Sequence, residues 1–117
     1  TVENVTKFKE ENLQAVYQGM YLVTNGSHGT LRTAFNDLPV KVAAKTGTAE
    51  EDKNRSSHTW FVCFAPFDDP QIAITVMIPF GEGSGTPAPA VAKAIIREYL
   101  GLDYTPTNTT MQTVLAE

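Results

Sequence analysis

Residues 40–49 read VKVAAKTGTA, and their alternation of side chains decides the reading of the central part of the chain. Alternate residues of a strand point to opposite faces, so even positions place valine, alanine and threonine together while odd positions include two lysines and a glycine. The stretch predicts a strand that begins apolar and ends polar. Residues 59–65 and 72–78 are rich in aromatic and β-branched residues, and short polar turns separate the three segments. Three antiparallel strands are therefore expected.

Two helices are expected to flank these strands. Residues 9–24 carry apolar side chains at three- and four-residue spacing, with acidic residues at the start and Asn25-Gly26 at the end. Residues 87–100 show a second apolar stripe, which ends at Gly101. Because the second and third strands are apolar on both faces, we expect both faces to be covered. The predicted fold class is α+β, an antiparallel sheet covered by helices.

The remaining segments carry neither strand nor helix periodicity. Residues 27–38 contain turn-forming residues and are expected to form a loop, and residues 50–57 are expected to form a solvated hairpin tip. The glycine-rich residues 81–86 predict a flexible connection, and the threonine-rich residues 102–117 predict a surface tail or strap.

Composition excludes several classes of protein. The 117 residues carry 9 Lys and Arg against 13 Asp and Glu, and a net charge of −4 argues against nucleic acid as a partner. No apolar run approaches the ~20 residues that span a bilayer, and the N-terminus lacks a signal-peptide pattern. A single cysteine excludes an internal disulfide and has no companion at zinc-ligand spacing. We expect Cys63 to be a small buried hydrophobic residue.

Residues 45–48, Lys-Thr-Gly-Thr, are the strongest candidate for a functional site. Lys45 supplies a positive field, and Thr46 and Thr48 project to one face where their hydroxyls could bind a carboxylate. Gly47 in a strand weakens packing, which is commonly tolerated where a ligand or another backbone approaches closely. By spacing alone, the glycine could equally mark a bulge or a turn near a strand end.

The context of this motif resembles a known family. The stretch AKTGTAE at 44–50 is followed by HTWF at 58–61 and by FAP at 64–66. This order resembles the C-terminal part of the transpeptidase domain of class B, monofunctional penicillin-binding proteins, and the resemblance extends from Leu13 to Leu100. Lys-Thr-Gly is the third motif of penicillin-binding proteins and β-lactamases. The resemblance implies that residues 1–117 are the C-terminal portion of a penicillin-binding, β-lactamase-like transpeptidase fold.

That resemblance implies cell-wall cross-linking through a serine acyl-enzyme, with peptidoglycan stem peptides as substrates and β-lactams as mimics of them. It implies no metal or cofactor. Lys45 and Thr48 would be catalytic, Lys45 through its positive field and Thr48 through a backbone N–H of the oxyanion hole. The hydroxyls of Thr46 and Thr48 would bind the substrate carboxylate, and Gly47 would leave room for substrate. The enzyme would act on the outer face of the bacterial cell membrane.

The nucleophile motif of that family is absent from this chain. Ser27, Ser56, Ser57 and Ser84 have neither a lysine three residues on nor an asparagine two residues on. We therefore expect a second polypeptide, carrying S-x-x-K and S-x-N, to supply the attacking serine. The membrane anchor would likewise belong to a missing N-terminal part. Without this companion, the chain is expected to expose a sheet edge and apolar surface.

Several alternatives remain open on the sequence alone. A serine β-lactamase shares the motif set, a β-lactam sensor domain acylates without turnover, and a binding module would not acylate at all. His58 is expected close to the cleft, with structural hydrogen bonding favoured over a catalytic role. Trp60 is expected in the core because its strand is the most apolar segment.

Overall fold

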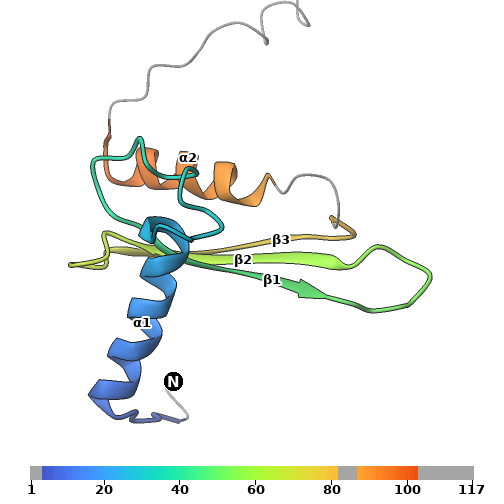
Figure 1. Ribbon diagram of the computed structural model, residues 1–117, viewed down its shortest axis with the longest axis horizontal. Coiled ribbons are helices and arrows are strands. Elements are labelled where there is room, and N and C mark those ends of the chain that lie inside the picture. The colour runs from blue at the N-terminus through green and yellow to red at the C-terminus, as the bar shows by residue number, and fades with distance from the viewer. Residues whose placement is uncertain (1–3, 82–86, 103–117) are drawn as a thin grey trace, which may run out of the picture.

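The computed structural model describes residues 4–81 and 87–102 (Figure 1). Five elements follow one another along the described residues: α1 (Glu10–Asn25), β1 (Ala43–Ala49), β2 (His58–Ala65), β3 (Ile72–Ile78) and α2 (Ala88–Tyr99). The three strands form one antiparallel sheet in the order β1-β2-β3. This arrangement confirms the predicted α+β class and the three-stranded meander.

The predicted element bounds agree with the structure to within a residue, except at the start of β1. The first strand begins at Ala43 instead of Val40, because Lys41 and Val42 are already engaged with other segments. The Lys41 carbonyl accepts the N–H of Phe67 at 2.9 Å, and the Val42 carbonyl accepts bonds from the end of α1. Most of the predicted glycine-rich connection and nearly all of the predicted tail lie outside the described residues.

One face of the sheet carries the hydrophobic core. Phe61, Cys63 and Ala65 of β2 are buried on this face beneath α2, which contributes its own buried residues Ala88, Ala92 and Ile96. Helix α2 lies along this face in Figure 1. Its apolar stripe repeats every four residues, as an amphipathic helix on a sheet requires.

The segment between α1 and β1 adds to the same core. Phe35 and Leu38 are buried, and the Phe35 ring stacks on Phe61 with 6.1 Å between centroids. Two basic side chains of α2 hold this segment from outside, since Lys93 Nζ and Arg97 Nη2 lie 2.9 and 2.8 Å from the carboxylate oxygens of Asp37. The predicted loop at 27–38 is therefore a loop that supplies core side chains.

Helix α1 meets the opposite face of the sheet through its C-terminal half only. Tyr17 packs edge-to-face on Phe64 with 5.4 Å between ring centroids, and the hydroxyl of Thr24 donates to the Val42 carbonyl. The chain then turns tightly at Gly29, where a Cβ would lie 2.4 Å from the Val23 carbonyl oxygen, so only glycine fits. The N-terminal half of α1 projects away from the sheet (Figure 1).

Candidate active site

Strand β1 carries all four predicted site residues and is an edge strand of the described sheet. Lys45 and Thr48 are exposed, while Thr46 and Gly47 are half-buried. The edge position follows from the strand order, since β1 pairs with β2 on one side only. The open side of β1 thus presents backbone N–H and C=O groups that the sheet itself does not use.

The register of β1 against β2 decides which face each site residue occupies. Directly opposed residues of an antiparallel pair share a face. Thr46 and Thr48 oppose Phe61 and Thr59 on the face that bears the core, so the two threonines share a face as expected. Lys45 and Gly47 oppose Val62 and Trp60 on the other face. The pairing of the two strands continues without interruption from Ala43↔Phe64 to Ala49↔His58.

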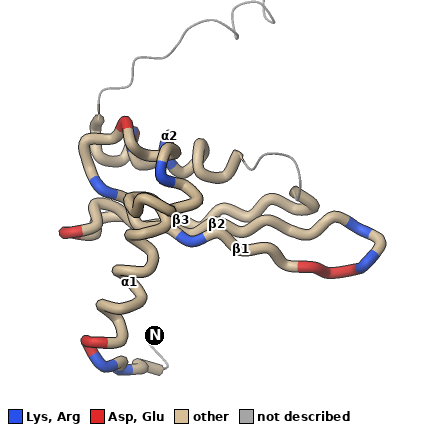
Figure 2. The backbone as a smooth tube through the Cα atoms, in the orientation of Figure 1, with Lys and Arg blue, Asp and Glu red and all other residues tan. Residues whose placement is uncertain are grey.

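The Lys45 ammonium folds back along the strand. Its Nζ donates a hydrogen bond to the Thr46 carbonyl, so the positive charge lies against the backbone of β1 itself. Lys45 is also the only charged side chain within β1. Figure 2 shows that the acidic and basic residues that follow β1 gather at the tip of the β1–β2 hairpin, beyond the strands. The strand therefore carries one cation on one face and two hydroxyls on the other, and each of these groups can bind an anionic ligand group.

His58 lies beside the end of β1, as predicted, because it pairs with Ala49. Its Nε2 lies 3.1 Å from Glu51 Oε2, and its Nδ1 accepts the N–H of Phe80 at 3.2 Å. Both ring nitrogens are therefore engaged in hydrogen bonds, which favours the structural alternative. Sequence reasoning missed the roles of Glu51 and Phe80, since residues 51, 58 and 80 form no motif and only the fold brings them together.

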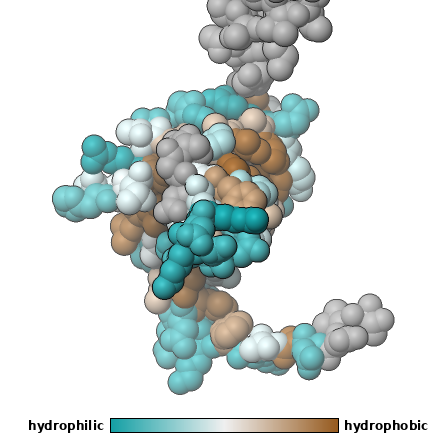
Figure 3. Space-filling model, turned by 90° about the vertical axis from the view of Figure 1, so that its right-hand side faces the viewer, coloured by the Kyte–Doolittle hydropathy of each residue, from teal (hydrophilic) through white to brown (hydrophobic). Residues whose placement is uncertain are grey.

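The expectation that Trp60 lies in the core is wrong for this chain. Trp60 is 41% exposed and shares its face of the sheet with Val62 and Met77, which are 37% and 45% exposed. Helix α1 reaches this face only near Phe64, so the expected cover on both faces is incomplete. Exposed hydrophobic surface is visible beside the hydrophilic hairpin tip in Figure 3. Cys63, by contrast, is buried as predicted.

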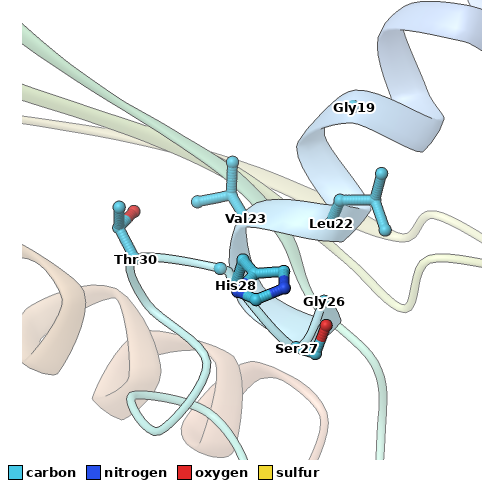
Figure 4. A pocket seen from close by; sticks show the side chains of 8 residues that line it. Gly19, Leu22, Val23, Gly26, Ser27, His28 and Thr30 are labelled. Carbon is cyan, nitrogen blue, oxygen red and sulfur yellow. The ribbon is translucent and has the colours of Figure 1, made fainter.

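A hollow of about 360 Å³ opens at the end of α1 (Figure 4). Residues of the helix and of the turn that follows line this hollow. The lining residues are Gly19, Leu22, Val23, Gly26, Ser27, His28, Gly29 and Thr30. None of these belongs to β1. The hollow and the candidate active site are therefore different features of the surface.

Within residues 4–81 and 87–102, no group of three or more His, Cys, Asp or Glu side chains is arranged to hold a metal ion. Neither described helix is long and apolar enough to cross a membrane.

Known proteins match most of the length of this chain. A family model described as the penicillin binding protein transpeptidase domain matches residues 1–97. Peptidoglycan D,D-transpeptidase MrdA of Haemophilus influenzae is 34% identical over 101 residues, which cover 74% of this chain and 16% of that protein. The chain thus spans about a sixth of the length of this relative.

Solved structures agree with this match. Penicillin-binding protein 2B from Streptococcus pneumoniae strain R6 superposes with a TM-score of 0.73 at 32% identity, covering 93% of this chain and 18% of that chain. Pseudomonas aeruginosa PBP2, solved in complex with WCK 5153, gives a TM-score of 0.71 at 34% identity, covering 85% of this chain and 21% of that chain. With its family match over most of its length and its sheet and helices in the same arrangement, the chain belongs to the penicillin-binding protein transpeptidase domain family, in its class B branch.

Proposed function

We propose that this chain forms the Lys-Thr-Gly side of the active site of a peptidoglycan D,D-transpeptidase. The observation that carries the proposal is the position of residues 45–48 on the edge strand of a family-typical sheet, with Lys45 and Thr48 exposed. The relative from Haemophilus influenzae bears the name of this activity. The enzyme would act outside the cytoplasmic membrane, held there by a part of the protein beyond this chain.

The reaction is acyl transfer in two steps. A serine hydroxyl attacks the carbonyl between the two terminal D-alanines of a stem peptide, the C–N bond breaks, and D-alanine leaves with a proton. The amine of a neighbouring stem then attacks the resulting ester, an amide bond forms, and the serine regains its proton. β-Lactams are attacked in the same way and leave the serine acylated.

Every residue of the motif then has a role in this reaction. The Lys45 ammonium attracts the substrate carboxylate and holds the serine of the second family motif, while the hydroxyls of Thr46 and Thr48 bind that carboxylate. Gly47 leaves room for substrate. The backbone N–H of Thr48 is one donor of the oxyanion hole, where it stabilises the negative charge that develops on the attacked carbonyl.

The hydrogen bond of Lys45 supports this role for the Thr48 amide. Residues two apart in a strand direct their N–H and C=O groups to the same side. The Thr46 carbonyl accepts a hydrogen bond from the Lys45 ammonium, as a carbonyl on the open side of β1 could do. The Thr48 N–H would then face the same open side, where a substrate carbonyl can reach it.

The nucleophile belongs to a segment outside this chain. None of the four serines has the S-x-x-K pattern, so a polypeptide segment carrying S-x-x-K and S-x-N would complete the pocket against the open side of β1. The exposed face around Trp60 and Val62 offers apolar surface for that segment.

Acylation by a fluorescent penicillin tests the proposal in the complete transpeptidase domain that contains this chain. We expect covalent labelling of a serine outside residues 1–117, and a loss of labelling rate on the order of 10²-fold or more in the Lys45→Ala variant. Wild-type labelling of that variant would overturn the assignment of this strand. Rapid hydrolysis of a chromogenic β-lactam would indicate a β-lactamase instead, and stable acylation without cross-linking of stem peptides would indicate a sensor.

A further inference from the structure

One imidazole joins the two loops that border the end of the motif strand. His58 opens β2 and pairs with Ala49, the last residue of β1. Its Nε2 meets the carboxylate of Glu51 in the hairpin that follows β1, and its Nδ1 meets the backbone N–H of Phe80 just beyond β3. The side chain is only 23% exposed. A single side chain thus connects the neighbouring ends of all three strands.

The two hydrogen bonds require the same neutral tautomer. A backbone N–H is a donor, so Nδ1 must accept and carries no proton, which leaves the ring proton on Nε2 to be donated to Glu51. In this state neither nitrogen is free to take a proton from an attacking serine. The geometry therefore argues against His58 as a general base and for a role in holding neighbouring segments.

Phe80 takes part in this junction through both its backbone and its ring. Among the described residues other than glycine, Phe80 alone has a positive φ, of 54°. Such a conformation persists where the surrounding structure imposes it. Its ring lies 4.7 Å from the His58 ring between centroids, and the Arg55 guanidinium lies 5.8 Å from the centroid of the Phe80 ring. Phe80 is therefore held through its backbone by His58 and through its ring by two side chains.

We propose that His58 is a positioning residue for the Thr48 amide, an inference that rests on the proposed function. Thr48 pairs with Thr59, and the Ala49–His58 pair is the only further pair before the chain leaves the sheet for the exposed hairpin. A terminal pair of a ladder opens readily unless side chains hold it. The links from His58 to Glu51 and Phe80 keep that last pair closed, and they thereby fix the direction of the Thr48 N–H.

Acylation kinetics of the complete transpeptidase domain test this role. In His58→Ala, we expect the rate constant for acylation by a fluorescent penicillin to fall about tenfold, because small misplacements of catalytic groups are costly. The dissociation constant of the non-covalent complex should change little, since the oxyanion forms only in the transition state. In His58→Asn, the amide oxygen can accept the Phe80 N–H in place of Nδ1 and should restore most of the rate. His28→Ala, at an exposed histidine of the α1 hollow, is the matched control.

Glu51→Ala provides a second test that does not depend on the folding of the histidine variants, because Glu51 lies in the exposed hairpin with a side chain 60% exposed. We expect its acylation rate to fall on the order of threefold, in keeping with the modest strength of exposed polar pairs. The same change should have no effect in the His58→Ala background.

Wild-type acylation rates in both His58→Ala and Glu51→Ala would overturn the positioning role. If Lys45→Ala still abolished acylation in that experiment, the proposed function would stand without it. Wild-type acylation in Lys45→Ala would instead overturn the proposed function itself. A His58→Asn variant as slow as His58→Ala would also contradict the proposal, because the proposal depends on the hydrogen bond that residue 58 accepts from the Phe80 N–H.

Discussion

Gly47 lies directly opposite Trp60 in the sheet, and a Cβ added to Gly47 would approach the Trp60 Cβ to 3.5 Å, an ordinary van der Waals contact. Apart from Gly47 and its two chain neighbours, no other described residue has a heavy atom within 4 Å of that position. Nothing in the chain's own packing therefore requires glycine at position 47. In the proposed function, the requirement for glycine comes from the substrate that approaches β1 from outside.

Gly47→Ala is accordingly expected to leave the chain's stability unchanged or to raise it by ~0.5–1 kcal/mol, because glycine in a strand loses more backbone entropy on folding than alanine. In the complete transpeptidase domain, the same variant should slow acylation by β-lactams. Urea unfolding and fluorescent penicillin labelling measure the two effects separately. A marked loss of unfolding free energy together with normal labelling would reverse this explanation.

Phe61 and Trp60 are neighbours in β2 with opposite environments, which makes them a matched pair. Phe61 is fully buried against Phe35, whereas Trp60 is 41% exposed. Truncation of a buried Phe to Ala typically costs ~3–5 kcal/mol, so Phe61→Ala should strongly destabilise the chain, and Trp60→Ala should cost clearly less. Chemical denaturation of the two variants decides the matter, and equal losses would show that the Trp60 face is covered in solution.

The contrast between these two residues shows how far sequence reasoning reaches. Strand positions followed from alternation and β-branched content, and helix positions from three- and four-residue spacing, so all five elements were predicted close to their observed bounds. Residues 59–65 are apolar on both faces, and such a pattern says only that both faces tend to be covered. The pattern does not say whether the covering residues belong to this chain or to another segment. For this reason it wrongly predicts that Trp60 lies in the core of this chain.

The candidate site likewise has one part that the sequence predicts and one part that only the fold reveals. Residues 45–48 form a contiguous motif, and their residue types alone indicate that they can bind an anionic group. Their catalytic roles remain predictions. The junction of Glu51, His58 and Phe80 depends on β2 lying between β1 and β3. Two of its links involve a backbone N–H and a hairpin carboxylate, neither of which leaves a pattern in the sequence.

The ion pairs of Asp37 predict a small dependence of stability on pH. The hydrogen bond from Lys93 is the main reason that the pKa of Asp37 is lowered from its ordinary value of 3.8, with Arg97 adding to the effect. A carboxyl whose pKa is lower in the folded state stabilises the fold above the unfolded pKa, and this stabilisation is lost as the pH falls through the lowered value. Because the Asp37 side chain is 48% exposed, we expect less than ~1 kcal/mol.

Unfolding of wild type and Asp37→Asn at a series of pH values measures this contribution. The difference between the two proteins should be constant from neutral pH to about pH 4 and should shrink below it, and added salt should reduce it throughout. Asp68→Asn, in the exposed turn after β2, is the matched control. A difference that grows on acidification would contradict the assigned direction of the shift.

Cys63 is expected to be chemically inert in the folded chain. Burial raises the pKa of its thiol to about 12, so at neutral pH it is protonated and shielded from reagents. Since the thiolate is the reactive form, iodoacetamide at pH 8 should not modify native protein within minutes and should modify urea-unfolded protein completely. Intact mass measurement reports both outcomes. Full modification under native conditions would show that this part of the core opens.

Thr48 combines two proposed functions that a pair of variants can separate. Thr48→Ala removes the hydroxyl and keeps the backbone N–H, whereas Thr48→Pro removes the N–H as well. If that N–H faces the open side of β1, proline breaks no ladder hydrogen bond, which is the situation in which edge strands tolerate proline. We expect Thr48→Pro to slow acylation of the complete domain ~10²–10³-fold, the usual cost of one oxyanion-hole donor, and Thr48→Ala to slow it far less. Comparable melting temperatures of the two variants would confirm that the sheet is intact. If both variants were slower than wild type by the same factor, the function of Thr48 would belong to its hydroxyl alone.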